Sequence, residues 1–509
     1  MFGFGKKGPA ESISTASQGP VANHASTRFS KAIVPVIACG AGLFSDGYIN
    51  NVIGSVTTTL ALQYGDLYKD SEAKKFASNI AFVGTVVGQL IFGWLADKWS
   101  RTNSLLVSTV ILVVFTALAT GSYYHGNAIG MFNMLATWRF FVGIGIGGEY
   151  PAGSVSCAES TSGLKSGSRN KAFIFSTATA IDVGFVMGAF VPWAVAAVCQ
   201  NSQYEVIWRT SMGVGVLFPL VLFVLRLYIK EPEEFQRNSM RHAKTPYWLS
   251  LRFYGWRLLC VSTIWFIYDF SAYSLGIYSS TILSNLYGDT APLTTVFGWN
   301  TVINLFLVPG TALGALASDW IEPRYQLALG TFLQALVGFI MAGFYEKLSQ
   351  PGTVGAFVVV FGIFMALGEA GPGNCCGLMA SKTCATGIRG QYYAIASAIG
   401  KMGAFVGTLA CSCVWSIAAI VNDLPLPVFP YIQAAAGKNA VASAQYPFWV
   451  SSSLCVLNAG LALCLPRVGQ DTIALEDARF REFLVANGYD TSQLGLKKSE
   501  SHENGGVVA

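Results

Sequence analysis

Residues 93–101 read Gly-Trp-Leu-Ala-Asp-Lys-Trp-Ser-Arg, and residues 314–324 read Gly-Ala-Leu-Ala-Ser-Asp-Trp-Ile-Glu-Pro-Arg. In each stretch an apolar segment ends in small residues and is followed by an aspartate and a basic residue. These are Asp97 and Arg101 in the first stretch, and Asp319 and Arg324 in the second. The two aspartates lie 222 residues apart. The recurrence indicates a duplicated chain, and duplicated halves with a site between them are common in membrane transporters.

The composition around these stretches is that of a membrane protein. Of 509 residues, 53% are hydrophobic and 12% are charged, whereas soluble domains carry roughly 25% charged residues. The net charge of +5 is small for this length, and no segment forms the basic face that nucleic-acid binding requires. We therefore exclude ordinary soluble, fibrous and disordered classes, expect the lipid bilayer as a partner, and expect no nucleic acid.

Apolar stretches long enough to cross a bilayer, which takes about 20 helical residues, recur from residue 31 onward. Lipid offers backbone groups no hydrogen-bond partner, so these stretches must be helices. The sequence predicts an all-α polytopic membrane protein with 12 transmembrane helices in two six-helix halves. The stretches lie near 33–62, 77–97, 103–122, 131–158, 171–198, 207–229, 257–286, 295–320, 326–346, 353–380, 391–421 and 447–465.

The segments between the apolar stretches predict domain boundaries and orientation. Lys and Arg gather after the second, fourth and sixth stretches, which places both tails and the central loop in the cytoplasm. A short helix is expected around 474–487. The predicted parts are a polar N-terminal tail (1–30), a first bundle (31–229), a central loop (230–256), a second bundle (257–466) and a C-terminal tail (467–509).

Glycines in the apolar stretches favour close helix packing. Gly143, Gly145 and Gly148 spell G-x-G-x-x-G, but a nucleotide site with that pattern requires a strand before the glycines, and here they lie inside a continuous apolar stretch. Glycines spaced by four recur in other stretches, as in helix-packing motifs. The eleven cysteines form no paired CxxC units and have no histidine nearby, so we expect no metal site.

Ionisable residues inside the membrane are candidates for function, because each costs at least roughly 2.5 to 3.5 kcal/mol at mid-bilayer. No histidine falls in an apolar stretch, so any proton must be carried by carboxylates. We expect Asp46, Glu149 and Asp269 in this role, since burial in a low-dielectric cavity favours the neutral carboxyl group. The full set is Asp46, Arg139, Glu149, Glu159, Asp182, Asp269, Glu369 and Lys401.

Three of the other acids are interpreted more cautiously. Glu159 lies close to a helix end and is expected to be hydrated. Asp182 and Glu369 stay open between a functional role and a structural hydrogen bond between helices. For these two acids the sequence supplies no further signal.

The two cations in this set have different expected partners. Arg139 lies ten residues before Glu149, about 15 Å along a helix, so the two cannot pair. We expect Arg139 to hold a carboxylate of a neighbouring helix, with Asp46 one candidate. Lys401 lies among small residues, and an anionic substrate is its natural counterpart. A structural ion pair with Glu369 or Asp269 is the alternative.

Three stretches resemble a known family. Residues 93–101 resemble the loop between helices 2 and 3 of the major facilitator superfamily, and the resemblance extends over roughly 31–465. Residues 147–151, Gly-Gly-Glu-Tyr-Pro, resemble the GGDYP signature of the phosphate:proton symporters. Residues 265–273 resemble their W-x-x-x-D-x-x-x-Y pattern, in which Trp265, Asp269 and Tyr273 share one helical face.

The resemblance implies roles for residues at matching positions. Trp265, Asp269 and Tyr273 are expected around a phosphate together with Tyr150 and Lys401, while Asp46 and Glu149 match proton-linked acids. Structural or gating roles are expected for Asp97, Arg101, Arg139, Asp319 and Arg324.

Departures from the phosphate carriers point to a larger substrate. Residues 371–374 read Gly-Pro-Gly-Asn, whereas the phosphate carriers have Asn directly after Gly-Pro, so one phosphate donor is lost and space opens. Asn374 is retained as a substrate-binding candidate. Together with residues 45–50 and 278–282, this pattern is similar to the fungal glycerophosphodiester permeases, which carry glycerophosphoinositol and glycerophosphocholine.

These expectations describe a transporter and not an enzyme. We expect proton-coupled import of a small anionic organophosphate across the plasma membrane by alternating access, in a monomer driven by the proton gradient without a cofactor. An inorganic phosphate:proton symporter and a nutrient-sensing receptor that no longer transports are the alternatives. The head group stays open, because Trp299, Asn300, Asn304, Tyr392 and Tyr393 could serve choline or inositol.

Overall fold

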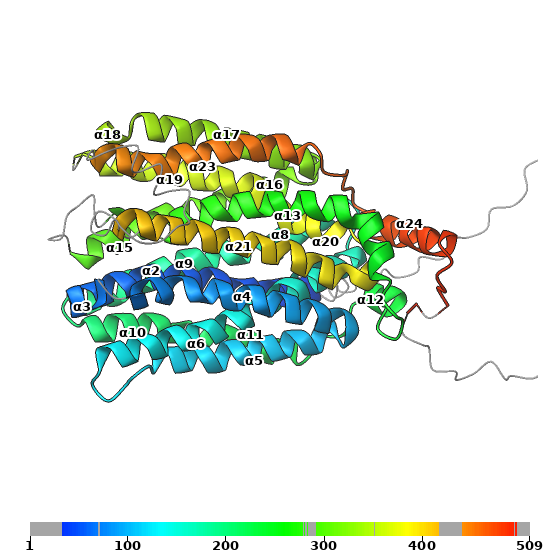
Figure 1. Cartoon of the computed structure of the whole chain (residues 1–509), viewed down its shortest axis with the longest axis horizontal. Coiled ribbons are helices and arrows are strands. Elements are labelled where there is room, and N and C mark those ends of the chain that lie inside the picture. Colours follow the sequence, from blue (N-terminus) through cyan, green and yellow to red (C-terminus); the bar gives the residue numbers. More distant parts are fainter. Residues whose placement is uncertain are drawn as a thin grey trace, which may run out of the picture.

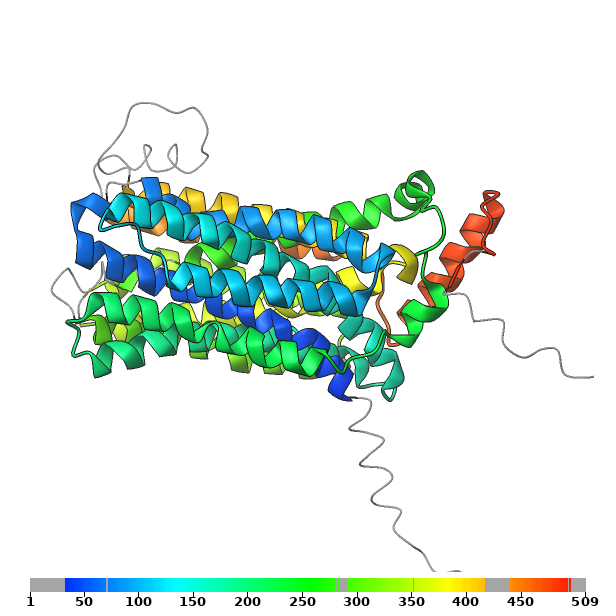
Figure 2. The same ribbon diagram turned by 90° about the horizontal axis from the view of Figure 1, so that it is seen from below.

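The computed structural model describes residues 33–69, 72–277, 279, 282–283, 292–350, 352–416, 440–492 and 494–495. Within these residues the chain forms helices joined by turns and loops, without a strand. The long helices run side by side along one axis (Figures 1 and 2). Ten helices of the described part are long and apolar enough to cross a membrane. The predicted all-α membrane architecture is confirmed.

Six of these ten candidate membrane spans lie in the first half of the chain. Several are built from consecutive helices that continue one another, so that Ala128 to Gly163 and Arg169 to Val198 each form one path. The elements are η1 (Ala41–Leu43), α2 (Phe44–Tyr64), α3 (Asp66–Lys69), α4 (Glu72–Lys98), α5 (Arg101–Thr120), α6 (Ala128–Gly148), η2 (Glu149–Ser154), α7 (Val155–Ser160), η3 (Thr161–Gly163), α8 (Arg169–Ser176), α9 (Ala178–Val198), α10 (Tyr204–Val214) and α11 (Leu217–Arg226).

The second half repeats the arrangement after the short connecting helix α12 (Glu233–Asn238). Its helix α24 lies close to the expected 474–487. The elements are α13 (Tyr247–Ile277), α15 (Leu293–Leu305), α16 (Leu307–Ala317), α17 (Pro323–Gly343), α18 (Tyr345–Leu348), α19 (Val354–Gly368), η4 (Glu369–Gly373), α20 (Asn374–Lys382), η5 (Thr386–Ile388), α21 (Arg389–Ser416), α23 (Ala440–Ala462) and α24 (Thr472–Ala486).

One helix boundary differs from the sequence prediction, and a second can be compared only in part. Helix α13 begins at Tyr247, ten residues before the expected 257, so the connecting segment is shorter than the predicted 230–256. Pro246 precedes it and its carbonyl accepts the first helical hydrogen bond, from Ser250. Helix α21 covers the eleventh predicted stretch up to Ser416, and 417–421 lie outside the described residues.

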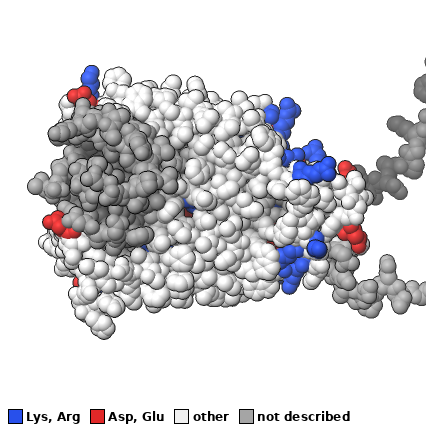
Figure 3. Space-filling model, viewed as in Figure 1, with Lys and Arg blue, Asp and Glu red and all other residues white. Residues whose placement is uncertain are grey.

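Charged side chains are concentrated at the ends of the bundle. Figure 3 shows a broad middle band largely without charge, and Lys and Arg clustered at the end that carries α12 and α24, here called the α24 end. Large apolar side chains such as Leu313 and Val221 are 67% and 61% exposed. Because exposed apolar surface of this extent is stable only in lipid, the band matches a bilayer.

The two halves pack against each other through several pairs of helices. Helix α4 contacts α21, α2 contacts α13, and α9 contacts α15 and α16. Within each half, glycines let helices approach closely: a Cβ on Gly88 would lie 2.2 Å from the carbonyl oxygen of Ile144, and one on Gly407 would lie 2.4 Å from that of Phe270. The interpretation of the G-x-x-x-G glycines as packing residues is confirmed.

Gly143, the first glycine of the G-x-G-x-x-G pattern, gives a direct test of this packing. A Cβ at this position would lie 2.1 Å from the carbonyl oxygen of Ala81 on α4. We expect Gly143→Ala to lower the stability by roughly 1 to 3 kcal/mol, because the two backbones must separate. Thermal unfolding of the detergent-solubilised protein measures the effect.

The matched control is Gly460→Ala in α23, where an added Cβ meets no atom within 4 Å. It should unfold at the wild-type temperature or slightly above it, because alanine has the higher helix propensity. Equal unfolding temperatures for the two variants would contradict the packing role of Gly143.

Candidate substrate and proton site

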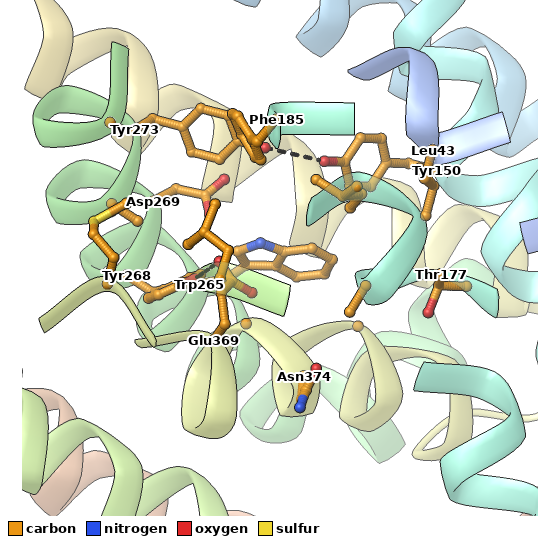
Figure 4. Close-up of a pocket in the computed structure, with 18 of the residues that line it drawn as sticks. Leu43, Tyr150, Thr177, Phe185, Trp265, Tyr268, Asp269, Tyr273, Glu369 and Asn374 are labelled. Carbon is orange, nitrogen blue, oxygen red and sulfur yellow. Dashed lines mark hydrogen bonds between the residues drawn. The ribbon is translucent and has the colours of Figure 1, made fainter. Parts of the chain in front are cut away.

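A cavity lies between the two halves and contains about 800 Å³ of empty space, its mouth included. Of the predicted substrate-binding residues, all but Lys401 line it (Figure 4). Tyr150 comes from η2 and the others from α13 and α20. The polar side chains of its wall are Tyr150, Thr177, Trp265, Tyr268, Asp269, Tyr273, Asn304, Glu369, Asn374 and Tyr393.

Lys401 lies behind this wall, although the sequence predicts direct contact with substrate. Its ammonium nitrogen lies 3.4 Å from Oδ2 of Asp46 and 3.7 Å from Oδ2 of Asp269. It also lies 3.6 Å from the ring centre of Tyr273 and 5.0 Å from that of Tyr150. One cation of the second half is thus shared by two carboxylates, one from each half. Of the two acids considered as structural partners, Asp269 is in contact.

Asp46 joins the cavity wall to Lys401. The phenol of Tyr150 donates a hydrogen bond to its Oδ2, and the phenol of Tyr273 donates to the same oxygen at 3.1 Å. Asn50, one turn further along α2, donates to Oδ1. The two phenol oxygens are 3.5 Å apart, and Figure 4 shows them facing each other across the cavity wall. A change at Asp46 therefore reaches the cavity through both phenols.

Glu149, the second predicted proton carrier, is held in a separate ion pair. Arg226 of α11 donates to both of its oxygens at 2.6 Å, and Ser108 donates to Oε1 at 2.9 Å. Both members of the pair are buried. Arg226 was not among the residues nominated from the sequence, because it lies near the end of its apolar stretch, where arginine usually marks the membrane boundary.

A second buried network closes the α24 end. Arg101 lies 2.7 Å from Asp97 and 3.0 Å from Glu159, and Arg389 of α21 lies 3.0 Å from Glu159. Asp97 also accepts hydrogen bonds from the backbone N–H groups of Gly390 and Gln391. The expectation that Glu159 is hydrated is wrong: it is 1% exposed, since two arginines from different halves enclose it.

Two other cations nominated from the sequence, Arg139 and Arg324, lie outside the Lys401 cluster. Arg139 is 1% exposed and its guanidinium has no hydrogen-bond partner among the described residues. It does not hold Asp46, whose carboxylate is already occupied by Lys401 and the two phenols. In the second copy of the repeat, Arg324 pairs with Glu322 at 3.0 Å and Asp319 with Lys171 at 3.7 Å.

Glu369 and Asp182, left open by the sequence, occupy different positions. Glu369 lines the cavity and accepts a hydrogen bond from the phenol of Tyr268 at 2.6 Å. Asp182 accepts one from Thr311 at the interface between α9 and α16 and is not part of the cavity wall. Among the suggested head-group residues, Asn304 and Tyr393 line the cavity, and Trp299, Asn300 and Tyr392 do not.

The Glu149–Arg226 pair gives a test of the buried electrostatics. Arg226→Met leaves Glu149 as an unpaired buried charge, which costs about 3 to 5 kcal/mol. The double variant Glu149→Gln/Arg226→Met removes both charges, so we expect it to regain most of the lost stability. Thermal unfolding of the purified variants measures this, and a double variant as unstable as Arg226→Met would contradict the pairing.

Comparisons with known proteins agree with this architecture. Residues 39–408 match the family model described as "Major Facilitator Superfamily". The xylose symporter XylE bound to 6-bromo-6-deoxy-D-glucose superimposes with a TM-score of 0.68 at 17% identity, over 90% of this chain and 99% of that chain.

Relatives named as permeases match most of the chain. The glycerophosphodiester transporter GIT2 of Candida albicans is 45% identical over 91% of this chain and 84% of the relative. The glycerophosphocholine permease GIT4 of the same organism is 43% identical over 94% and 88%. An inorganic phosphate transporter of Oryza sativa is 25% identical over 78% and 85%. The chain thus belongs to the major facilitator superfamily and, within it, to the branch of the fungal glycerophosphodiester permeases.

Proposed function

We propose that this membrane transporter imports a glycerophosphodiester together with protons across the plasma membrane. The α24 end faces the cytoplasm, where the positive-inside rule puts its Lys and Arg residues. The observation that carries the proposal is the shared ammonium of Lys401, which lies within 4 Å of Asp46 and Asp269 behind two phenols of the cavity wall.

This geometry makes phosphate binding depend on protonation. With both acids ionised, the cluster carries one more negative than positive charge, and Tyr150 and Tyr273 donate to Asp46. A phosphate about 4 Å from a carboxylate is repelled by about 4 kcal/mol at a partly buried site. Protonation of Asp46 and Asp269 removes this repulsion, frees the two phenols as donors and leaves Lys401 to attract the phosphate.

Alternating access requires the closure at the α24 end to open. The network of Asp97, Arg101, Glu159 and Arg389 binds the halves together at the α24 end and must separate when the substrate leaves on that side. The proton is proposed to pass between the cavity and Glu149. During that movement Glu149 would separate from Arg226 and bind the proton. Transport in this scheme needs one chain and no cofactor.

The cavity favours a diester over inorganic phosphate. Its wall combines apolar and aromatic side chains with several separate polar groups, as the sites of ligands with more than one functional group do. Glycine at position 373 makes room for the Glu369 carboxylate at this wall, since a Cβ there would lie 2.0 Å from Oε2 of Glu369.

Uptake into proteoliposomes tests the proposal. We expect wild-type protein to accumulate radiolabelled glycerophosphodiester when the outside is acidic, and to lose accumulation on addition of an uncoupler. Asp269→Asn should abolish accumulation driven by the pH gradient, because the variant cannot exchange a proton next to Lys401. Accumulation that is independent of the pH gradient would contradict proton coupling.

Competition separates the proposal from the phosphate alternative. A large excess of unlabelled inorganic phosphate should reduce diester uptake only weakly, because phosphate lacks the glycerol and head group that would contact the rest of the cavity wall. Complete inhibition by phosphate at concentrations near those of the diester would favour the inorganic phosphate symporter.

A further inference from the structure

The cavity wall at Glu369 carries an acidic group without a matching cation among the described residues. Its carboxylate accepts one hydrogen bond, from Tyr268, and forms no ion pair with a described Lys or Arg. Of the described residues that line the cavity, none is Lys, Arg or His. A carboxylate on the wall of a membrane-embedded cavity is costly unless something compensates it.

At the corresponding position of the first half, the acid Glu149 is compensated by a cation. Glu149 and Glu369 lie 220 residues apart, and each begins a π-helical turn, η2 and η4 respectively. Such turns occur frequently at functional sites. Arg226 neutralises Glu149 through two hydrogen bonds of 2.6 Å, whereas Glu369 has only a phenol. The duplicated acid is thus paired in one half and open to the cavity in the other.

Four hydroxyl groups of this wall already donate hydrogen bonds to the protein. Tyr268 donates to Glu369, Tyr150 and Tyr273 donate to Asp46, and Thr177 donates to a backbone carbonyl at 2.7 Å. A polyol such as inositol requires donors and acceptors together. A quaternary ammonium has no hydrogen to donate and no acceptor, and it binds to carboxylates and the faces of aromatic rings.

We propose that Glu369, with the rings of Tyr268 and Trp265, forms a subsite for a quaternary ammonium, so that the transporter prefers glycerophosphocholine to glycerophosphoinositol. The inference rests on the proposed function and identifies the head group of the transported diester. In the view of Figure 4, Glu369 lies on the opposite side of the Trp265 indole from the phenols of Tyr150 and Tyr273.

The two ends of a zwitterionic diester match this arrangement. Its phosphate is directed to the phenols and Lys401, and its ammonium to Glu369. The described acids at the cavity and behind it, Asp46, Asp269 and Glu369, outnumber the one ammonium of Lys401. Glycerophosphocholine adds no net charge to this site, whereas glycerophosphoinositol adds one negative charge.

Paired uptake measurements on Glu369→Gln test the subsite. We expect KM for glycerophosphocholine to rise by at least roughly tenfold, which corresponds to about 1.4 kcal/mol, while KM for glycerophosphoinositol stays constant or falls. Glu369→Asp keeps the charge and should retain the preference for glycerophosphocholine. The matched control is Glu476→Gln, which removes a buried acid that pairs with Arg257 at 2.8 Å away from the cavity wall, and it should leave the ratio of the two KM values unchanged.

The outcomes separate this inference from the proposed function. If wild-type protein carries neither diester, the proposed function fails. If it carries both and Glu369→Gln weakens both equally, or if it prefers glycerophosphoinositol, the head-group assignment alone is overturned.

A second measurement does not depend on a folded variant. Choline added to wild-type proteoliposomes should inhibit glycerophosphocholine uptake more strongly than myo-inositol at the same concentration. Equal or stronger inhibition by myo-inositol would overturn the assignment.

Discussion

The burial of one ammonium between two carboxylates from different halves is the interaction on which the rest of the site depends. Lys401 contacts Asp46 of α2 and Asp269 of α13, and the phenols of Tyr150 and Tyr273 cover it from the cavity. Such a cluster is stable only while its charges nearly balance. In the proposed mechanism a proton or a phosphate that enters changes this balance, and both halves respond because each contributes an acid.

The two halves of the chain repeat one arrangement of helices, but the acids at corresponding positions have different partners. Both halves place an acid at a π-helical turn, but Arg226 neutralises Glu149 in one, while Glu369 faces the cavity in the other. Likewise Asp97 joins the halves at the α24 end, whereas its counterpart Asp319 contacts Lys171. The acids of the repeated positions thus differ in their partners: arginines hold Asp97 and Glu149 in the first copy, whereas Glu369 of the second copy lines the cavity.

Much of the fold and part of the site could be predicted from the sequence. Hydropathy predicts the helices because lipid requires them, and the spacing of Trp265, Asp269 and Tyr273 predicts a shared face that indeed lines the cavity. Partners between helices could not be predicted, because they depend on how each helix is rotated and tilted. For this reason the sequence offers Asp46 only as one candidate partner of Arg139 and wrongly predicts a hydrated Glu159. It also gives no signal for the buried partners Arg226 and Arg389.

Proton uptake linked to substrate binding tests the central role of the Lys401 cluster most directly. Calorimetric titration of the purified protein with glycerophosphocholine, in buffers of different ionisation enthalpy at one pH, measures the number of protons bound per ligand. The account predicts net proton uptake by wild-type protein and a smaller uptake by Asp269→Asn. Substrate binding without any proton uptake by wild-type protein would contradict it.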